Sequence, residues 1–262
     1  MGGNRKEGVR DAAVIGGGAM ADHGLMRAYV GPGDYVVCAD GGLGHAYAMG
    51  VAPDAVVGDL DSMDPATKGR MEADEARRAL AVERHPADKD HTDMELAMRR
   101  LLAFAGPAAV GLIKVLGAIG TRLDHTAANM HMLARYAEAG FRVMAADERN
   151  EVWPLCARPG GHGPAIHRIC APPARAGRRP DDGGPCPGGI GHAPDAASAA
   201  PPKVSLIPYG GPVRGVTTND LRYPLAGAAL SPFQAEVSNE VSGPDPTVSI
   251  TEGTLLIMLS WD

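Results

Sequence analysis

The chain has 262 residues, which is enough for one large domain or two modest ones, each with its own core. Hydrophobic residues make up 45% of the chain and charged residues 21%, proportions typical of a soluble globular protein. The formal net charge of -6 disfavours nonspecific binding to nucleic acid or to an anionic membrane, because both favour a basic surface.

The first half of the chain alternates short apolar runs with segments of helical pattern. Apolar residues recur at helical spacing in 94–102, and a second helix is predicted over 126–139, with Gly140 as its cap. Strands alternating with helices predict an α/β domain over residues 1–150, with a mostly parallel sheet covered by helices. The runs predicted to be strands are 12–15, 35–39, 55–57, 112–116 and 141–145.

The composition changes after residue 150. From about 157 to 202 the chain is crowded with Pro, Gly, Ala and Arg and has no apolar period, so it cannot bury enough surface to offset the cost of ordering. We therefore interpret 151–202 as a linker with a flexible, Pro/Gly-rich insertion. Strand character returns in 203–207, 213–217 and 247–259, the last as two strands joined through Glu252 and Gly253, which predicts a small all-β domain over 203–262.

Three glycines follow the first predicted strand. Gly16, Gly17 and Gly18 would let backbone N–H groups approach a phosphate, and with Ala21 they fit the loose dinucleotide pattern G-x-G-x-x-A. Asp40 ends the next strand, where such a fold carries a ribose-binding acid. A tight turn from strand to helix also needs glycine, so both interpretations stay open.

Two aspartates follow the third predicted strand. Asp59 and Asp61 are spaced i, i+2, so in extended geometry both carboxylates point to the same side. Two close anions repel unless a cation lies between them, and hard oxygen ligands of this kind suit Mg²⁺. A turn rich in Asp, Ser and Gly is the alternative interpretation.

A second acidic cluster lies at the predicted start of helix 94–102. Asp90 and Asp93 are three residues apart and would face one way in its first turn. Asp90 could instead cap the helix, with Thr92 and Asp93 placed favourably against its dipole. Lys89 favours a phosphate site, because a lysine beside clustered acids supplies a point charge for a phosphate that a metal also holds.

The fourth segment, 117–130, follows another predicted strand with a glycine-bearing turn. Arg122 can offer two parallel hydrogen bonds to a phosphate, and Asp124 could bind metal, accept a hydroxyl proton or cap the helix. His125 and Asn129 are expected to face the same cleft. Because the carboxyl ends of parallel strands share one edge of the sheet, these segments together predict a site for metal-assisted phosphoryl transfer.

At these residues the sequence resembles the thiamine pyrophosphokinase family. The motifs that carry the resemblance occur in order: CADGG at 38–42, PDAVVGDLDS at 53–62, KDxTDxExA at 89–97, RLDH at 122–125, VSLIPYGG at 204–211 and VSNE at 237–240. Several independent motifs in the family's order are more specific than any one of them.

The resemblance implies an N-terminal α/β domain, a C-terminal β-sandwich and a homodimer with active sites at the subunit interface. It implies transfer of the β,γ-diphosphate of ATP to thiamine, with AMP as the second product and Mg²⁺ as the metal. The residues carried over as metal, phosphate and nucleotide ligands are Asp40, Asp59, Asp61, Lys89, Asp90, Thr92, Asp93, Arg122, Asp124, His125 and Asn129, and those for thiamine are Ser238 and Asn239.

The chain departs from the family pattern in three places. Leu60 stands where the family usually has an aromatic residue, and Thr121 replaces the second glycine of a GGR turn. Neither change removes a charged group. The segment from 157 to 202 is longer than the usual connection between the two domains.

Two other functions are compatible with parts of the sequence. A nicotinamide-dependent oxidoreductase would explain the glycines and Asp40 but leaves the acidic clusters without a task. A non-catalytic nucleotide or thiamine sensor of the same fold would not need the intact acids, Lys89 and Arg122. A metal site in the insertion, made from His162, His167, Cys170, Cys186 and His192, fits no zinc spacing.

The expected compartment is the cytoplasm. The four cysteines include no CxxC pair, which favours a reducing environment. The N-terminus has no apolar stretch of signal-peptide length, and no run approaches a membrane span.

Overall fold

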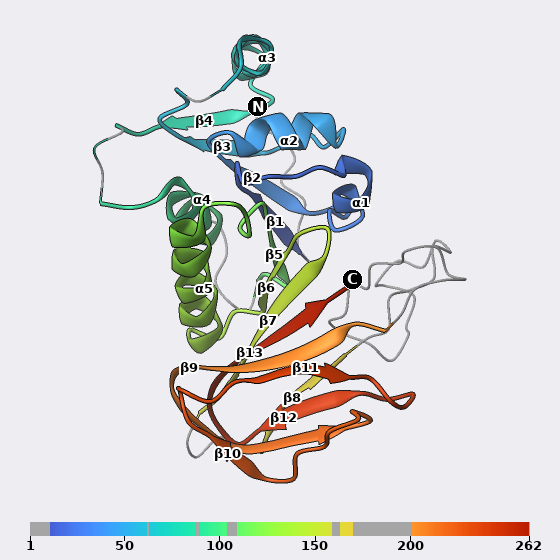
Figure 1. Ribbon diagram of the computed structural model, residues 1–262. Coiled ribbons are helices and arrows are strands. Elements are labelled where there is room, and N and C mark those ends of the chain that lie inside the picture. Colours follow the sequence, from blue (N-terminus) through green and yellow to red (C-terminus); the bar gives the residue numbers. More distant parts are fainter. Residues whose placement is uncertain are drawn as a thin grey trace. The chain divides into compact units, whose positions relative to one another are not determined.

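The structure is a computed structural model that describes residues 11–61, 63–86, 88, 90–103, 109–158, 163–169 and 201–261 (Figure 1). The chain divides into two compact units, Met1–Glu148 and Arg149–Asp262. No helix in the described ranges is long and apolar enough to cross a membrane.

The first unit contains a sheet of parallel strands in the order β4-β3-β2-β1-β5-β6 (Figure 1). Four of these strands are buried at every position, which explains why apolar runs in the sequence identify them. The strands are β1 (Ala12–Ile15), β2 (Tyr35–Ala39), β3 (Ala55–Gly58), β4 (Ala81–Arg84), β5 (Ile113–Leu116) and β6 (Val143–Ala146).

Helices follow most of these strands, as the alternating pattern predicts. The bounds are α1 (His23–Arg27), α2 (Gly42–Ala48), α3 (Pro65–Ala76), α4 (Asp93–Leu102) and α5 (Leu123–Glu138). Helix α4 packs on β1, β2 and β3, and α5 packs on β6. Gly140 takes a φ of 95°, which ends α5 where the sequence predicts.

Three helices are capped by side chains at their first turns, and α1 is capped by Asp22, which accepts from the backbone N–H of Leu25 at 2.8 Å. Asp64 caps α3 through the backbone N–H groups of Ala66 and Thr67, both at 3.0 Å. Thr92 caps α4 by accepting a hydrogen bond from the backbone N–H of Glu95 at 3.2 Å. This corrects the interpretation of Asp90 as the cap, because Asp90 lies two residues before the capping position.

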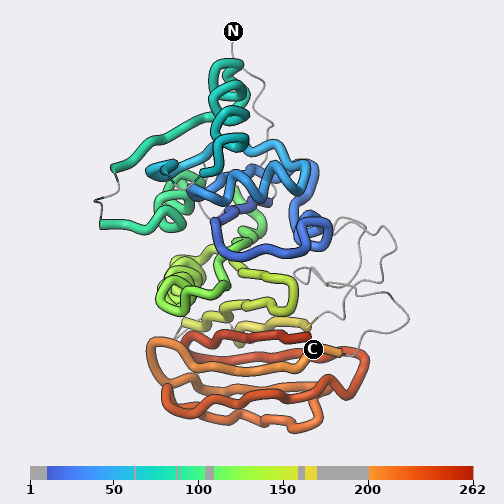
Figure 2. The backbone as a smooth tube through the Cα atoms, turned by 45° about the horizontal axis from the view of Figure 1, so that its top comes forward, coloured from blue at the N-terminus to red at the C-terminus, as the bar shows by residue number. Residues whose placement is uncertain are grey.

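The second unit is β-rich and is built around the long strand β9 (Lys203–Asn219), shown in orange in Figure 2. The first half of β9 lies between β13 and β11, and its second half pairs with β12 and β10. Strand β7 pairs with β13, and β8 pairs with β12. The other strands are β7 (Asn150–Ala157), β8 (Ala165–Arg168), β10 (Ala228–Leu230), β11 (Glu236–Glu240), β12 (Thr247–Ile250) and β13 (Glu252–Ser260).

Two sequence-based boundaries in this unit need correction. The runs 203–207 and 213–217 form one strand because Gly210 and Gly215 take φ values of 72° and 64°, which let β9 bend without ending. The break within 247–259 falls at Thr251, and the two strands pair with β9 rather than with each other.

The range 151–202 also differs from a plain linker. It contains most of β7 and all of β8, because Val152, Trp153 and Ile169 are buried and hold these segments in the unit. Most of the remaining range, including 170–200, lies outside the described residues.

Candidate functional site

The loops after β1 and β5 touch at the carboxyl edge of the parallel sheet. The backbone N–H of Gly18 donates to the Gly117 carbonyl oxygen at 3.2 Å. A Cβ on Gly18 or Gly117 would collide with backbone atoms of the other loop, and Gly117 has a φ of 66°. Glycine is therefore required here for close backbone approach.

The loops after β2 and β3 lie side by side at the same edge. Asp40 follows β2 with a φ of 43°, and its backbone N–H donates to the Val57 carbonyl oxygen at 2.9 Å. A Cβ on Gly58 would come within 3.0 Å of the Asp40 Cβ. Asp40 is thus adjacent to the residue before Asp59, although the two acids are 19 residues apart in the sequence.

The start of α4 reaches this edge as well. Met94, the second residue of α4, places its Cε where a Cβ of Gly16 would lie, and Gly16 directly follows β1. Asp93, the first residue of the helix, is therefore next to the carboxyl end of β1. The segments carrying Asp40, Asp59 and Asp93 thus reach one edge of the sheet, as parallel topology predicts.

The segment from Asp59 to Asp61 is a turn and not an extended strand. Leu60 has a φ of 62°, in the left-handed region, and its side chain is buried. The backbone N–H of Asp61 donates to the Asp59 carboxylate at 3.3 Å. The prediction that i, i+2 spacing in extended geometry aligns the two carboxylates is therefore wrong, because β3 ends at Gly58.

The two acids of the second cluster, Asp90 and Asp93, lie before and at the start of α4. Asp90 is exposed and Asp93 is half-buried. Their i, i+3 spacing does not place them on one helix face, because only Asp93 is in the helix. Lys89 lies outside the described residues.

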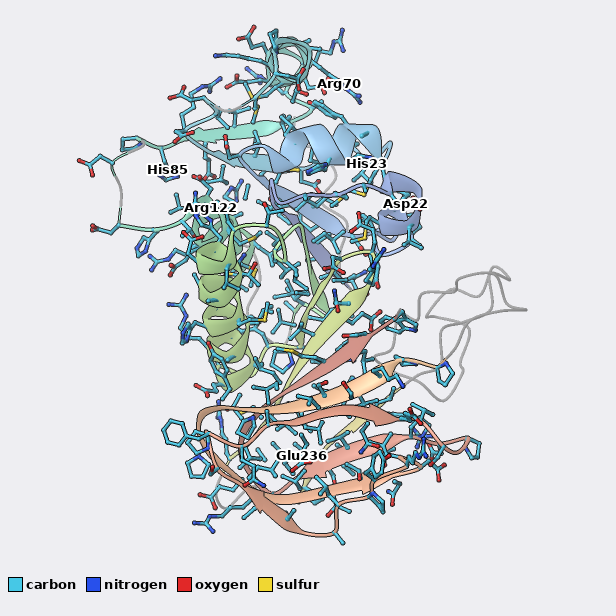
Figure 3. All side chains as sticks on the ribbon, in the orientation of Figure 1. Asp22, His23, Arg70, His85, Arg122 and Glu236 are labelled. Carbon is cyan, nitrogen blue, oxygen red and sulfur yellow. The ribbon has the colours of Figure 1, made fainter. Side chains whose placement is uncertain are left out.

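Arg122 and Asp124 form an exposed ion pair at the start of α5, where Figure 3 labels Arg122. Arg122 Nη2 donates to Asp124 Oδ2 at 2.6 Å, and Nε donates to Oδ1 at 3.3 Å. This pairing, together with the His125 backbone N–H, lowers the pKa of Asp124 to about 2. Asp124 is therefore ionised at neutral pH and is a weak proton acceptor.

Replacing Arg122 by glutamine should raise the pKa of Asp124 from about 2 toward the ordinary value of 3.8. The main hydrogen bond that favours the charged carboxylate is lost, while the His125 backbone contribution remains. A carboxyl ¹³C NMR titration of the wild type and of Arg122→Gln measures this shift. An Asp124 pKa that does not move would contradict the ion pair.

Asn129, the seventh residue of α5, is buried. Its side-chain nitrogen donates to the Ala118 carbonyl oxygen at 2.8 Å, so it fixes the loop between β5 and α5. His125 is exposed beside this loop. Their predicted contact with the nucleotide stays a prediction.

The two residues predicted to bind thiamine lie on β11 of the second unit. Ser238 is exposed with a φ of 59°, and its backbone N–H donates to Ser205 Oγ at 3.1 Å. Asn239 is buried, and its amide group donates to the Tyr223 carbonyl at 2.7 Å and accepts from the Tyr223 N–H at 3.0 Å. Asn239 therefore holds the backbone of Tyr223, an exposed aromatic residue.

Comparison with known protein families matches both units. The model "Thiamin pyrophosphokinase, catalytic domain" matches residues 26–145, and "Thiamin pyrophosphokinase, vitamin B1 binding domain" matches residues 195–255. The chain belongs to the thiamin pyrophosphokinase family.

Two curated relatives support the assignment to the thiamin pyrophosphokinase family. The thiamine pyrophosphokinase of Bacillus subtilis is 23% identical over 214 residues, covering 81% of this chain and 81% of the relative. Thiamine pyrophosphokinase 1 of Oryza sativa subsp. japonica is 26% identical over 238 residues, covering 84% of this chain and 76% of the relative.

Solved structures share the fold. The crystal structure of the Bacillus subtilis thiamine pyrophosphokinase has a TM-score of 0.73 at 20% identity, covering 97% of this chain and all of that one. The thiamin pyrophosphokinase of Geobacillus thermodenitrificans has a TM-score of 0.68 at 25% identity, covering 96% and 97% of the two chains.

This member of the thiamin pyrophosphokinase family has polar contacts that the sequence pattern does not reveal. Glu148, which follows β6, accepts hydrogen bonds from the backbone N–H groups of Ala21 and Asp22. Ala21 belongs to the loose dinucleotide pattern, so one amide at the N-terminal end of that pattern's helix is already bound to a carboxylate. This contact does not support the oxidoreductase alternative.

A second missed group joins helices α4 and α5. Glu95 accepts hydrogen bonds from Arg135 at 2.9 Å and from Arg99 at 3.4 Å. The hydrogen bond from Arg135 lowers the pKa of Glu95. Helical spacing could reveal the Arg99 contact within α4, but the contact with Arg135 depends on how the two helices pack.

No group of three or more His, Cys, Asp or Glu side chains in the described ranges is arranged to hold a metal ion. Of the cluster considered in the insertion, His167 packs against the Trp153 ring with centroids 5.0 Å apart. The other four residues lie outside the described ranges.

Proposed function

We propose that this chain transfers the diphosphate of ATP to the hydroxyl group of thiamine, giving thiamine diphosphate and AMP. The observation that carries the proposal is the gathering of Asp40, Asp59 and Asp93 at one edge of a parallel sheet, within a chain that matches both family models in order. This edge is where α/β sheets bind ligands.

The acids at this edge suit a metal-bound polyphosphate. Mg²⁺ is usually held by one or two carboxylates, with water and substrate phosphates completing its shell, so a preformed cage of protein ligands is not required. Asp59 and Asp61 are our first candidates for this role, with Asp90 and Asp93 as further ligands. When bound, the ion would neutralise charge on the phosphates.

The remaining polar residues have separate roles in the proposal. Arg122 would leave Asp124 and bind a phosphate oxygen, because its guanidinium matches either anion. Lys89, Thr92, His125 and Asn129 would line or support the nucleotide site. Asp93 or Asp124 would accept the thiamine proton, because the pKa of Asp124, about 2 while Arg122 is paired with it, would rise once Arg122 binds the phosphate. A loose transition state requires no strong base.

The second unit is proposed to bind thiamine through Ser238 and the segment that Asn239 holds. The rest of the family picture is part of the same proposal: helices on both faces of the first sheet, a β-sandwich for the second unit, a homodimer with the active site at the subunit interface, and a cytoplasmic location.

The direct test is AMP formation from ATP by the purified full chain. We expect AMP to appear only when both thiamine and Mg²⁺ are present, in a one-to-one ratio with thiamine diphosphate. ADP as the nucleotide product, or AMP formation that is independent of thiamine, would refute the proposed reaction.

A further inference from the structure

The loop between β1 and α1, residues 16–22, is held by more contacts than a turn needs, and we call it the glycine loop. It precedes the region that matches the family's catalytic model, which begins at residue 26. Gly18 at its centre donates its backbone N–H to Gly117 at 3.2 Å. Three further contacts come from side chains of α2 and of the segment after β6.

The first of these side chains is His45 of α2. Its Nε2 lies 2.9 Å from the Gly18 carbonyl oxygen, and its Nδ1 lies 2.9 Å from His23 Nε2. A carbonyl oxygen only accepts, so His45 must carry its proton on Nε2 and donate it to Gly18. His45 Nδ1 is then an acceptor, and His23 donates to it. His23 thus donates to His45 and His45 donates to Gly18, an arrangement that requires His45 to be neutral.

The second side chain is Glu148, whose Oε1 accepts from the backbone N–H groups of Ala21 and Asp22, the latter at 3.1 Å. Burial raises the pKa of Glu148, but hydrogen bonds from its own backbone N–H and from those of Asp22 and Ala21 outweigh burial and lower it. The glycine loop is therefore held at Gly18 by an imidazole and at its C-terminal end by a carboxylate. Figure 3 labels Asp22 and His23 at the start of α1.

The contacts leave two loop amides on the accessible side. Gly17 and Ala19 are exposed, and neither backbone N–H makes a hydrogen bond within the described part of the chain. They flank Gly18, whose own N–H and C=O groups are both engaged. Backbone N–H groups of a glycine-bearing turn between a strand and a helix can bind an anion such as phosphate when they have no protein acceptor.

We propose that His45 and Glu148 are positioning residues that hold the glycine loop so that the Gly17 and Ala19 amides bind a phosphate group of the nucleotide substrate. The inference rests on the proposed function and deepens it. The glycine loop lies at the same sheet edge as the acids, because Gly16 contacts Met94 at the start of α4. It supplies phosphate binding without a charged side chain.

His45 makes these contacts with Gly18 and His23 only while it is neutral. Burial lowers the pKa of His45 from its ordinary value of 6.5. His23 lowers it further, because a protonated His45 would direct a second N–H group at the N–H of His23. The hydrogen bond to Gly18 and the charge of Glu148 act in the opposite direction. His23 and Glu148 are the titratable groups that act on it. Since the folded form binds this proton less readily than the unfolded chain, the contact is fully present above about pH 6.5 and is lost on further acidification.

The experiment compares His45→Leu with His45→Gln in the full chain. Leucine removes the donor to Gly18, whereas the glutamine amide can reach the same carbonyl. We expect His45→Leu to raise the KM for ATP about tenfold, as for loss of one well-placed hydrogen bond, with the KM for thiamine unchanged. The KM of His45→Gln for ATP should stay within about threefold of the wild-type value. His131→Gln, an exposed histidine of α5, is the matched control.

Glu148 provides an independent arm. Glu148→Ala removes the oxygen that accepts from both loop amides and should raise the KM for ATP by a similar factor. Glu148→Gln keeps one side-chain oxygen as an acceptor and should have the smaller effect. Equal loss in the alanine and glutamine variants would overturn the positioning role of this carboxylate.

A binding measurement separates this inference from the reaction itself. In α,β-methylene ATP the link between the α- and β-phosphorus atoms cannot be cleaved. Calorimetry with this analogue and Mg²⁺ should give the highest affinity for the wild type, a lower one for His45→Gln and the lowest for His45→Leu. If the wild type makes no AMP, the proposed reaction fails, and this titration still decides the role of the glycine loop. Equal affinities for the leucine and glutamine variants would overturn the inference.

The pH dependence gives a readout that a purely structural role would not change. The affinity of the wild type for the analogue should fall below about pH 6.5. In His45→Gln this acid limb should be smaller, because the amide does not titrate and only the terminal phosphate of the analogue, with a pKa of about 6, still does. An acid limb of the same size in both proteins would overturn the inference even if His45→Leu does not fold.

Discussion

Replacing Asp59 by asparagine should lower kcat for AMP formation by about a thousandfold, because a preorganised charge at the polyphosphate contributes on the order of a hundred- to a thousandfold and the metal is also bound less tightly. The substitution keeps the size of the side chain and a hydrogen-bond acceptor for the Asp61 backbone N–H. It removes only the negative charge. Steady-state kinetics over a range of Mg²⁺ concentrations should show a lower kcat and a higher Mg²⁺ requirement.

Asp64 offers a matched control for this substitution. It lies five residues after Asp59 and caps α3 through the backbone N–H groups of Ala66 and Thr67. Asparagine is an equally good helix cap, so Asp64→Asn should leave the free energy of unfolding nearly unchanged and should change kcat by less than about twofold. An Asp59→Asn protein with more than about a third of wild-type kcat would contradict the metal role.

The strands predicted best are those buried on both faces. The sequences of β1, β2 and β3 are continuous apolar runs because every position except the half-buried Tyr35 is buried. Strand β4 was not predicted, since its residues, AVER, are half-buried or exposed at the sheet edge and carry no apolar run. Strand β7 was missed because Pro154 and the biased composition that follows obscure its pattern.

The site was predicted at the level of segments rather than of contacts. Parallel topology brings strand ends to one edge, so Asp40 and Asp59 could be grouped from the order of the predicted strands, whereas Asp93 follows β4, which was not predicted. The left-handed turn at Leu60 could not be read from the sequence, since a leucine there gives no signal of a positive φ. The contact of Glu148 with Ala21 joins residues 127 positions apart and depends on the finished fold.

Lys114 is the charged residue whose replacement should most affect stability. It lies within β5, its side chain is 3% exposed, and its ammonium nitrogen lies 2.8 Å from Asp34 Oδ2 and 3.1 Å from Asp11 Oδ2. Asp34 also accepts from the Gly31 backbone N–H at 2.7 Å, and Asp11 from the Leu112 N–H at 2.9 Å. These acids precede β2 and β1, so the cluster joins the amino ends of three adjacent strands.

Lys114→Met should therefore lower the free energy of unfolding by about 3–5 kcal/mol, because it leaves the buried Asp34 carboxylate without its cation. Urea unfolding measures the change, and Lys68→Met, an exposed lysine of α3, should cost less than about 0.5 kcal/mol. Adding Asp34→Leu to Lys114→Met should recover much of the loss, since removing both charges avoids the uncompensated anion. If the double variant is as unstable as the single one, packing at position 114, and not charge, determines stability. The cluster is at the edge of the sheet opposite the acids of the site, so the KM for ATP of the folded variant should match that of the wild type.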